Sequence, residues 1–190
     1  DLIIFSFQKP NATEENGDLI SSLNPPPFVI AGLREAAGIA SAASIRLLIE
    51  SEPICWADTA LATADLVAMI GAEQVGVNYD PSNLAWAERR DPIAEFASLS
   101  AFIGNVHIKN HRPASHGSGM PEWIVPDEGV LDLRSHLAAL HAIGYGGPIS
   151  LEPHINHPSP DVIRRCKDAV ETLWSQVIAD TGASTAAVSN

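Results

Sequence analysis

Residues 75–80 read Val-Gly-Val-Asn-Tyr-Asp, a short, mostly apolar run that ends on a carboxylate. Three further strand-like segments also deliver a side chain that can bind a divalent metal: residues 45–50 with Glu50, residues 103–109 with His107, and residues 148–152 with Glu152. Successive parallel strands of a β/α barrel bring their carboxyl ends to one mouth, where such enzymes do their chemistry. The pattern therefore predicts that Glu50, Asp80, His107 and Glu152 converge.

Helix-like segments alternate with these strands. A first strand is predicted at residues 2–7, and a polar loop follows over residues 8–24. The predicted helices cover residues 28–43, 58–70, 91–102, 132–143 and 159–179, with Asp58, Asp91 and Asp132 as N-caps and Gly71 and Gly144 as stops. Five strands alternating with helices indicate parallel pairing through helical crossovers.

The predicted fold is α/β and resembles a TIM (β/α)8 barrel with five β/α units, lacking the first three strand-helix units. A complete barrel takes about 250 residues, whereas this chain has 190. An open doubly wound sheet is the alternative, but no Gly-rich phosphate loop follows the first strand. We expect one partial barrel domain over residues 1–180 and a flexible tail over residues 181–190. Because the chain begins at Asp1, close to a strand, we also expect it to be part of a longer protein.

Composition limits the partners. The formal net charge is -12, which disfavours nucleic acid and anionic membrane surfaces. Cys55 and Cys166 lie far apart, without metal-binding or redox spacing, which indicates reduced thiols and a cytoplasmic location. No apolar run approaches the roughly 20 residues of a membrane helix. The sequence therefore predicts a soluble protein with a small-molecule partner, and a homo-oligomer is possible.

The four strand-end residues are a mixed set of metal ligands. Three carboxylates and one imidazole suit one divalent ion such as Mn, Co, Mg or Zn. Such an ion has positions left for a 2-hydroxy carbonyl compound, polarises the carbonyl, and acidifies the adjacent C–H. Acidic residues at strand ends are often merely solvated or cap a loop. Four potential ligands at the same place on four strands are harder to obtain by accident than a single acidic residue at one strand end.

Other side chains are candidates for substrate contacts. Lys109 lies on the same strand face as His107 because alternate residues share a side, so one can bind metal and the other a substrate oxyanion. Asn83, in a turn predicted at residues 80–83, and His154, just after Glu152, are further candidates. Trp123 lies in a long loop over residues 111–130, where it either packs or walls off a substrate. The helix histidines His136 and His141 are expected to face solvent.

These residues resemble the xylose isomerase-like TIM barrel superfamily, which includes sugar phosphate isomerases and epimerases, cyclitol dehydratases and endonucleases. The resemblance runs from about residue 45 to residue 152 and rests on Leu48-Ile49-Glu50 and on residues 76–83, 106–110, 127–132 and 144–152. It implies that Glu50, Asp80, His107 and Glu152 bind one divalent metal. It also implies that Glu50 and Glu152 are catalytic and exchange protons on opposite faces of a ketose through an enediolate.

The sequence departs from that family pattern at Asn110, where many relatives have Asp, and at Asn83, where several have a substrate-contacting His. The leading hypothesis is a divalent-metal-dependent isomerase or epimerase of a sugar or related hydroxy-carbonyl compound. A non-catalytic or binding remnant of the barrel is the alternative, and an inosose-type cyclitol dehydratase is a third reading. The endonuclease branch fits poorly because it binds a phosphate backbone, which an acidic chain disfavours.

Overall fold

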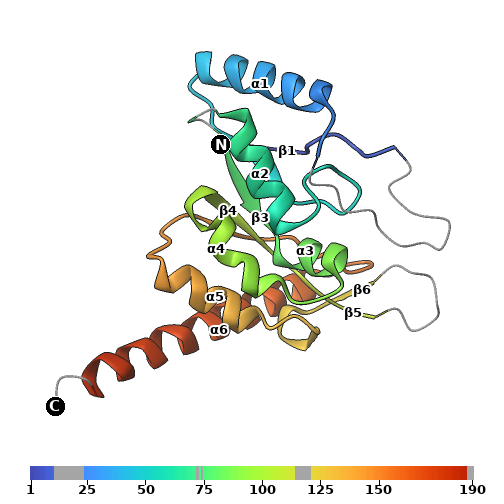
Figure 1. Ribbon diagram of the computed structural model, residues 1–190. Helices are drawn as coiled ribbons and strands as arrows, with labels where there is room; N and C mark the ends of the chain where they lie inside the picture. Colours follow the sequence, from blue (N-terminus) through green and yellow to red (C-terminus); the bar gives the residue numbers. More distant parts are fainter. Residues whose placement is uncertain (11–23, 72, 74, 114–120, 188–190) are drawn as a thin grey trace. The chain divides into compact units, whose positions relative to one another are not determined.

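The computed structural model describes residues 1–10, 24–71, 73, 75–113 and 121–187 (Figure 1). Two compact units make up the chain. The first consists of Asp1–His107 with Gly147–Ser150, and the second consists of Ile108–Gly146 with Leu151–Asn190. Each unit is described by itself below. The predicted polar loop over residues 8–24 lies largely outside the described residues.

A five-stranded sheet forms the centre of the first unit, with the strand order β1-β2-β3-β4-β7. The strands are β1 (Leu2–Ile4), β2 (Leu47–Glu50), β3 (Val75–Tyr79), β4 (Ile103–Ile108) and β7 (Ile149–Leu151). Pairing is parallel from β1 to β4. The β7 strand continues this pattern, since the N–H of Val106 donates to the oxygen of Pro148 at 3.2 Å and that of Glu152 donates to the oxygen of Ile108 at 3.1 Å. The predicted parallel α/β arrangement is confirmed.

Helices join the strands of the first unit. They are α1 (Pro27–Ala42), α2 (Ala60–Ile70), α3 (Pro81–Glu88) and α4 (Phe96–Leu99), with 3-10 turns η1 (Pro92–Glu95) and η2 (Ser100–Phe102) on either side of α4. The first two pack against each other (Figure 1). Thr59, and not the predicted Asp58, caps α2, because its side chain accepts a bond from the N–H of Ala62. Gly71 ends this helix at φ 67°, as predicted.

Two predictions for the first unit were wrong in detail. Residues 80–83 form the N-cap and first turn of α3 and not an isolated turn. Pro81 is compatible with both because its fixed φ suits a turn and the first position of a helix equally. Residues 91–102 form η1, α4 and η2 in place of one continuous helix, although Asp91 caps the segment as predicted.

The second unit contains a short ribbon and two longer helices. Strands β5 (Asn110–Arg112) and β6 (Glu122–Ile124) pair antiparallel, where the sequence indicated only a loop. After the turn η3 (Pro126–Glu128) come α5 (Leu133–Ala142) and α6 (Pro160–Ala187), which pack together. The last helix extends beyond Ala179, where the sequence predicted its end. Its residues Cys166 and Ala169 form a small core with Val125.

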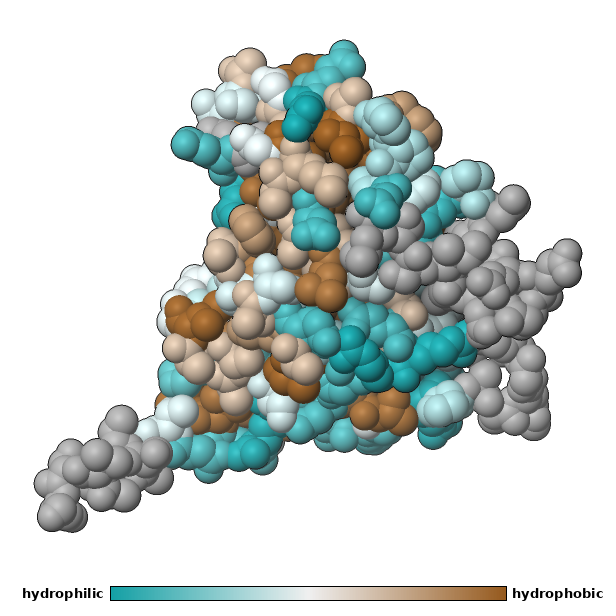
Figure 2. All heavy atoms as spheres, in the orientation of Figure 1, coloured by the Kyte–Doolittle hydropathy of each residue, from teal (hydrophilic) through white to brown (hydrophobic). Residues whose placement is uncertain are grey.

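Apolar side chains reach the surface of the first unit. Phe28 and Ile39 on α1 are 62% and 67% exposed, and Figure 2 shows hydrophobic residues on the surface where this helix lies. Among the described residues, β1 has a strand neighbour on one side only, so the sheet is open there. In the part of the chain that the structure describes, no helix has the length and apolar character needed to span a membrane.

Candidate metal centre

Three predicted ligands meet at the carboxyl ends of neighbouring strands in the first unit. Glu50 ends β2, Asp80 follows β3, and His107 lies next to the end of β4. Each offers one ligand atom, and these atoms lie within 4.8 Å of one another. Parallel pairing produces this cluster directly, because it aligns the strand ends at one edge of the sheet.

Glu50 is a buried carboxylate that contacts an imidazole and an amide. It is 3% exposed, and its Oε1 lies 3.3 Å from Nδ1 of His107 and 3.4 Å from Nδ2 of Asn83. Within the described residues no Lys or Arg forms an ion pair with it. A buried carboxylate without a compensating cation is costly, so this position favours a positively charged ligand.

Asp80 has a structural role as well as its place in the cluster. Its Oδ1 accepts bonds from the backbone N–H groups of Ser82 and Asn83, both at 2.9 Å, and so caps α3. The positive end of the helix stabilises the carboxylate. Both capping hydrogen bonds go to Oδ1. A metal could therefore bind Oδ2 without breaking the bonds that start α3.

Asn83, in the first turn of α3, connects this helix to the segment after β2. Its Nδ2 donates to the oxygen of Ser51 at 2.9 Å and lies 3.2 Å from Oε2 of Glu52, in addition to the contact with Glu50. An amide has only two N–H donors, so these acceptors share them. The observed contacts therefore make Asn83 a residue that positions Glu50.

A buried polar layer, which the sequence analysis missed, lies one step back along the strands. Nδ2 of Asn105 donates to Oδ1 of Asn78 at 2.7 Å, and Oγ of Ser150 donates to Oδ1 of Asn105 at 3.1 Å. These residues precede Asp80, His107 and Glu152 by two positions, and therefore share a strand face with them. A polar residue two positions before Asp80, His107 and Glu152 was the signal that could have revealed this layer.

Glu152 belongs to the second unit, where it forms an ion pair. Its Oε2 lies 2.5 Å from Nζ of Lys109, and its Oε1 lies 3.4 Å from Nε2 of His154. The side chain of Lys109 is only 2% exposed. Lys109 is therefore a buried cation that neutralises Glu152, and not the surface amine that a strand-end lysine usually is.

An aromatic group lies beside this ion pair. Nζ of Lys109 is 5.3 Å from the ring centroid of Trp123, a cation-π distance. The Trp123 ring makes edge contacts with His111 and His154, with centroids 5.6 Å and 5.2 Å apart. Burial and, to a smaller extent, the charge of Lys109 lower the pKa of His111, which favours its neutral form. Trp123 thus belongs to a group of polar and aromatic side chains, and His111 is a member that the sequence analysis did not select.

Asn110, the residue that departs from the family pattern, has a clear structural role. Its Nδ2 donates to the oxygens of Pro126 and Leu131 at 2.7 and 3.0 Å. Its Oδ1 accepts from the N–H groups of His111 and Leu131 at 2.8 and 3.2 Å. A carboxylate cannot donate the first two bonds. The amide therefore fixes the segment after β6, which gives Asn110 a structural role.

The donor set of the first unit fits a hard or borderline divalent cation. Two carboxylates and one neutral imidazole are suitable for Mn, Co, Mg or Zn, and they leave coordination positions for a further protein ligand and for oxygens of a small molecule. The hydrogen bond from Asn83 to Glu50 is the kind of outer-shell contact that orients metal ligands.

Comparison with protein families gives a match to the model described as "Xylose isomerase-like TIM barrel" over residues 27–173. No curated protein matches the chain by sequence. Solved structures do resemble it. The IOLI protein with a bound zinc atom is 20% identical with a TM-score of 0.68, and the match covers 84% of this chain and 61% of that one.

Two further solved structures have related folds. The 3-keto-D-glucoside 4-epimerase YcjR from E. coli is 16% identical with a TM-score of 0.66, over 91% of this chain and 63% of that one. The probable 3-DHS dehydratase AsbF from Bacillus anthracis is 18% identical with a TM-score of 0.63, over 75% of this chain and 55% of that one. The chain thus spans between half and two thirds of these proteins, which agrees with five units of an eight-unit barrel.

Proposed function

This chain belongs to the xylose isomerase-like TIM barrel family, and we propose that it is a divalent-metal-dependent isomerase or epimerase of a sugar or related hydroxy-carbonyl compound. The observation that carries the proposal is the cluster of Glu50, Asp80 and His107, whose ligand atoms lie within 4.8 Å of one another. Such a cluster needs a cation, because Glu50 is buried without a Lys or Arg partner among the described residues.

Glu152 is proposed as the fourth ligand. It directly follows β7, the strand next to β4 in the sheet, and so occupies the same strand-end position as the other three. The ion is one of Mn, Co, Mg or Zn, and the similar IOLI structure holds zinc. When bound, the metal would polarise the carbonyl of the substrate and make the adjacent C–H more acidic.

Glu50 and Glu152 are proposed to move the proton through an enediolate. Glu50 is held by Asn83 and His107, so its carboxylate has a fixed direction. Glu152 is held by Lys109, whose charge favours the carboxylate form that accepts a proton. Two carboxylates with different surroundings suit a reaction in which one removes a proton and the other returns it.

Asn83, Lys109 and His154 are proposed to contact the substrate, with Trp123 beside them as an apolar wall. Asn83 has amide donors directed at Glu50 and its neighbours, and Lys109 has its charge at Glu152. Substrate binding would therefore occur next to groups that already position the two carboxylates. A small sugar is the proposed partner, in a cytoplasmic protein that does not bind nucleic acid or membranes and can form homo-oligomers.

A dehydratase remains the second candidate because the fold is also similar to that of the probable 3-DHS dehydratase. Removal of a proton next to a carbonyl begins both reactions, and they differ in whether a hydroxyl then leaves. Product analysis by NMR distinguishes them. One argument for a non-catalytic protein was that Asn110 replaces the Asp of many relatives. This argument is weaker because Asn110 has a structural role of its own.

The first experiment measures metal content and metal affinity of the purified protein by mass spectrometry and calorimetry. We expect about one divalent ion per chain, and loss of that ion in a Glu50→Gln, Glu152→Gln double variant. Glu35→Gln, which changes an exposed glutamate on α1, is the matched control and should keep the metal.

Turnover is then followed as deuterium incorporation from heavy water into a panel of ketoses, with the bound metal present. Glu152→Gln should abolish incorporation while the protein remains folded. Full turnover in this variant would refute the proposed proton transfer. Absence of metal binding in the folded wild-type protein, even with excess ion, would favour the binding-protein reading.

A further inference from the structure

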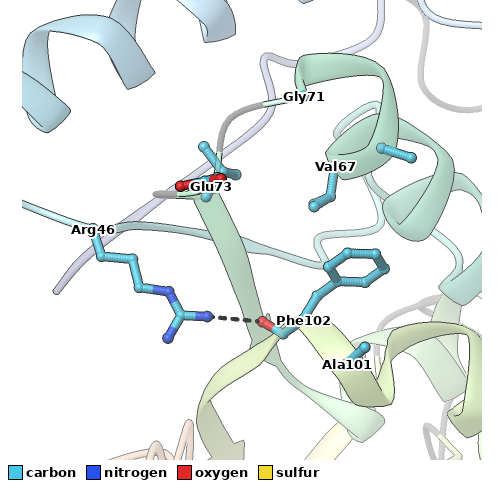
Figure 3. Close-up of a pocket in the computed structure, with 8 residues that line it drawn as sticks. Arg46, Val67, Gly71, Glu73, Ala101 and Phe102 are labelled. Carbon is cyan, nitrogen blue, oxygen red and sulfur yellow. Dashed lines mark hydrogen bonds between the residues drawn. The ribbon is translucent and has the colours of Figure 1, made fainter.

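A pocket lies in the first unit, at the opposite ends of the strands that carry the candidate metal ligands. It has a volume of about 330 Å³ (Figure 3). Its lining comes from the amino ends of β2, β3 and β4 and from the end of α2: Arg46, Val67, Ala68, Gly71, Glu73, Val75, Ala101 and Phe102. This volume lies at the lower end of the range for sites that hold small molecules.

Arg46 is the principal polar group of this pocket. Its guanidinium extends toward the Phe102 carbonyl, with Nη2 at 3.4 Å from the oxygen (Figure 3). Among the described residues, this long contact is the only hydrogen bond that the Arg46 side chain makes. A guanidinium has five N–H donors. A half-buried Arg46 therefore has most of its donors available for a ligand.

Two glycines leave room for this guanidinium. A Cβ at Gly76 would lie 2.5 Å from Nη2 of Arg46 and 2.7 Å from the oxygen of Phe102. A Cβ at Gly104 would lie 2.9 Å from Nη1. Any other residue at these positions would displace Arg46. The guanidinium of Arg46 thus packs against the backbone of β3 and β4 at these two glycines.

The remaining walls restrict the chemistry of a ligand. Val67 and Val75 are buried, and Phe102 adds an aromatic surface. Glu73 also lines the pocket and is exposed, so the site offers one cation, one anion and an apolar wall. Arginine binds carboxylates through two parallel hydrogen bonds. A ligand with a carboxylate, an amine and an apolar body matches all three features.

We propose that this pocket binds a small amino carboxylate with an aliphatic side chain. Its carboxylate would pair with Arg46, its amine would face Glu73, and its aliphatic part would pack against Val67 and Phe102. The site is independent of the proposed metal centre, because the two use opposite ends of the same strands.

Calorimetric titration tests this with three probes on the intact chain. Leucine carries both charges, 4-methylpentanoate lacks the amine, and 3-methylbutylamine lacks the carboxylate. We expect saturable binding of leucine, weaker binding of 4-methylpentanoate and none of the amine. Arg46→Gln should weaken leucine binding by at least about tenfold. Glu73→Gln should weaken the binding of leucine but leave the binding of 4-methylpentanoate unchanged. Arg164→Gln, an exposed arginine on α6, is the matched control.

Ala101→Leu provides a test that keeps Arg46. It fills the pocket from an exposed position, so leucine binding should be lost while thermal unfolding and metal affinity stay unchanged. If Arg46→Gln fails to fold, Ala101→Leu still tests whether leucine binds in this pocket. No saturable binding of leucine by the wild-type protein up to about 10 mM, or binding that persists in Ala101→Leu, would overturn the proposal.

Discussion

The two glutamates proposed for catalysis lie in different units and have opposite surroundings. Glu50 in the first unit is 3% exposed and contacts an imidazole and an amide, without a Lys or Arg partner among the described residues. Glu152 in the second unit is paired with buried Lys109 at 2.5 Å. Among the described residues, the first carboxylate thus has no Lys or Arg partner, and the second has Lys109.

This difference indicates what each unit contributes. Under the proposed function, the first unit supplies two carboxylates and an imidazole, and a bound cation would offset the carboxylate charge. The second unit supplies a carboxylate whose charge is compensated and whose neighbours are aromatic, which suits contact with an organic substrate.

Asp80→Asn should remove metal binding and leave the fold intact. Asparagine keeps an oxygen that can cap α3 in place of Oδ1, but it replaces the second oxygen with an NH2 group, which cannot bind a cation. We expect the metal dissociation constant, measured by calorimetry, to rise by at least roughly 100-fold. Asp65→Asn, at an exposed position on α2, should leave it unchanged. Unaltered metal affinity in Asp80→Asn would place the metal elsewhere.

The proximity of three candidate ligands could be predicted from the sequence because strands determine their geometry. Glu50, Asp80 and His107 lie together because parallel pairing aligns strand ends, which periodicity alone can indicate. The ribbon of β5 and β6 was missed because strands of three residues carry no clear period. Its two strands lie about ten positions apart in the sequence, with Asn110 opposite Ile124 and Arg112 opposite Glu122, so no local pattern marks the pairing.

His136 shows a different kind of error. It was predicted to face solvent, yet it is fully buried. Leu133, His136, Leu137 and Leu140 follow the i, i+3, i+4, i+7 spacing of one helix face, and all four are buried. The spacing therefore contained the correct answer, and the chemical character of histidine was given too much weight. By contrast, the ion pair of Lys109 with Glu152 joins distant parts of the sequence and has no local signal.

Asn110→Asp should destabilise the second unit. The substitution removes both hydrogen bonds to the oxygens of Pro126 and Leu131 and places a buried charge beside them. We expect the free energy of unfolding, from urea denaturation, to fall by about 3 kcal/mol. Asn156→Asp changes an exposed asparagine and is the control. A stable variant that gains activity absent from the wild type would instead mean that Asn110 replaces a lost catalytic acid.

The smallest effect concerns pH and His111. Burial lowers its pKa in the folded protein below the ordinary value of 6.5, so on acidification the unfolded chain takes up this proton first. The stability that neutral His111 contributes is complete above pH 6.5 and is lost as the pH falls through the lower folded value. Urea denaturation at several pH values should therefore show that the free energy of unfolding declines below pH 6.5. This decline should be smaller in His111→Gln and unchanged in His157→Asn. An identical decline in His111→Gln would mean that groups other than His111 cause it. The contact between His111 and Trp123 would then have no part in the pH dependence of stability.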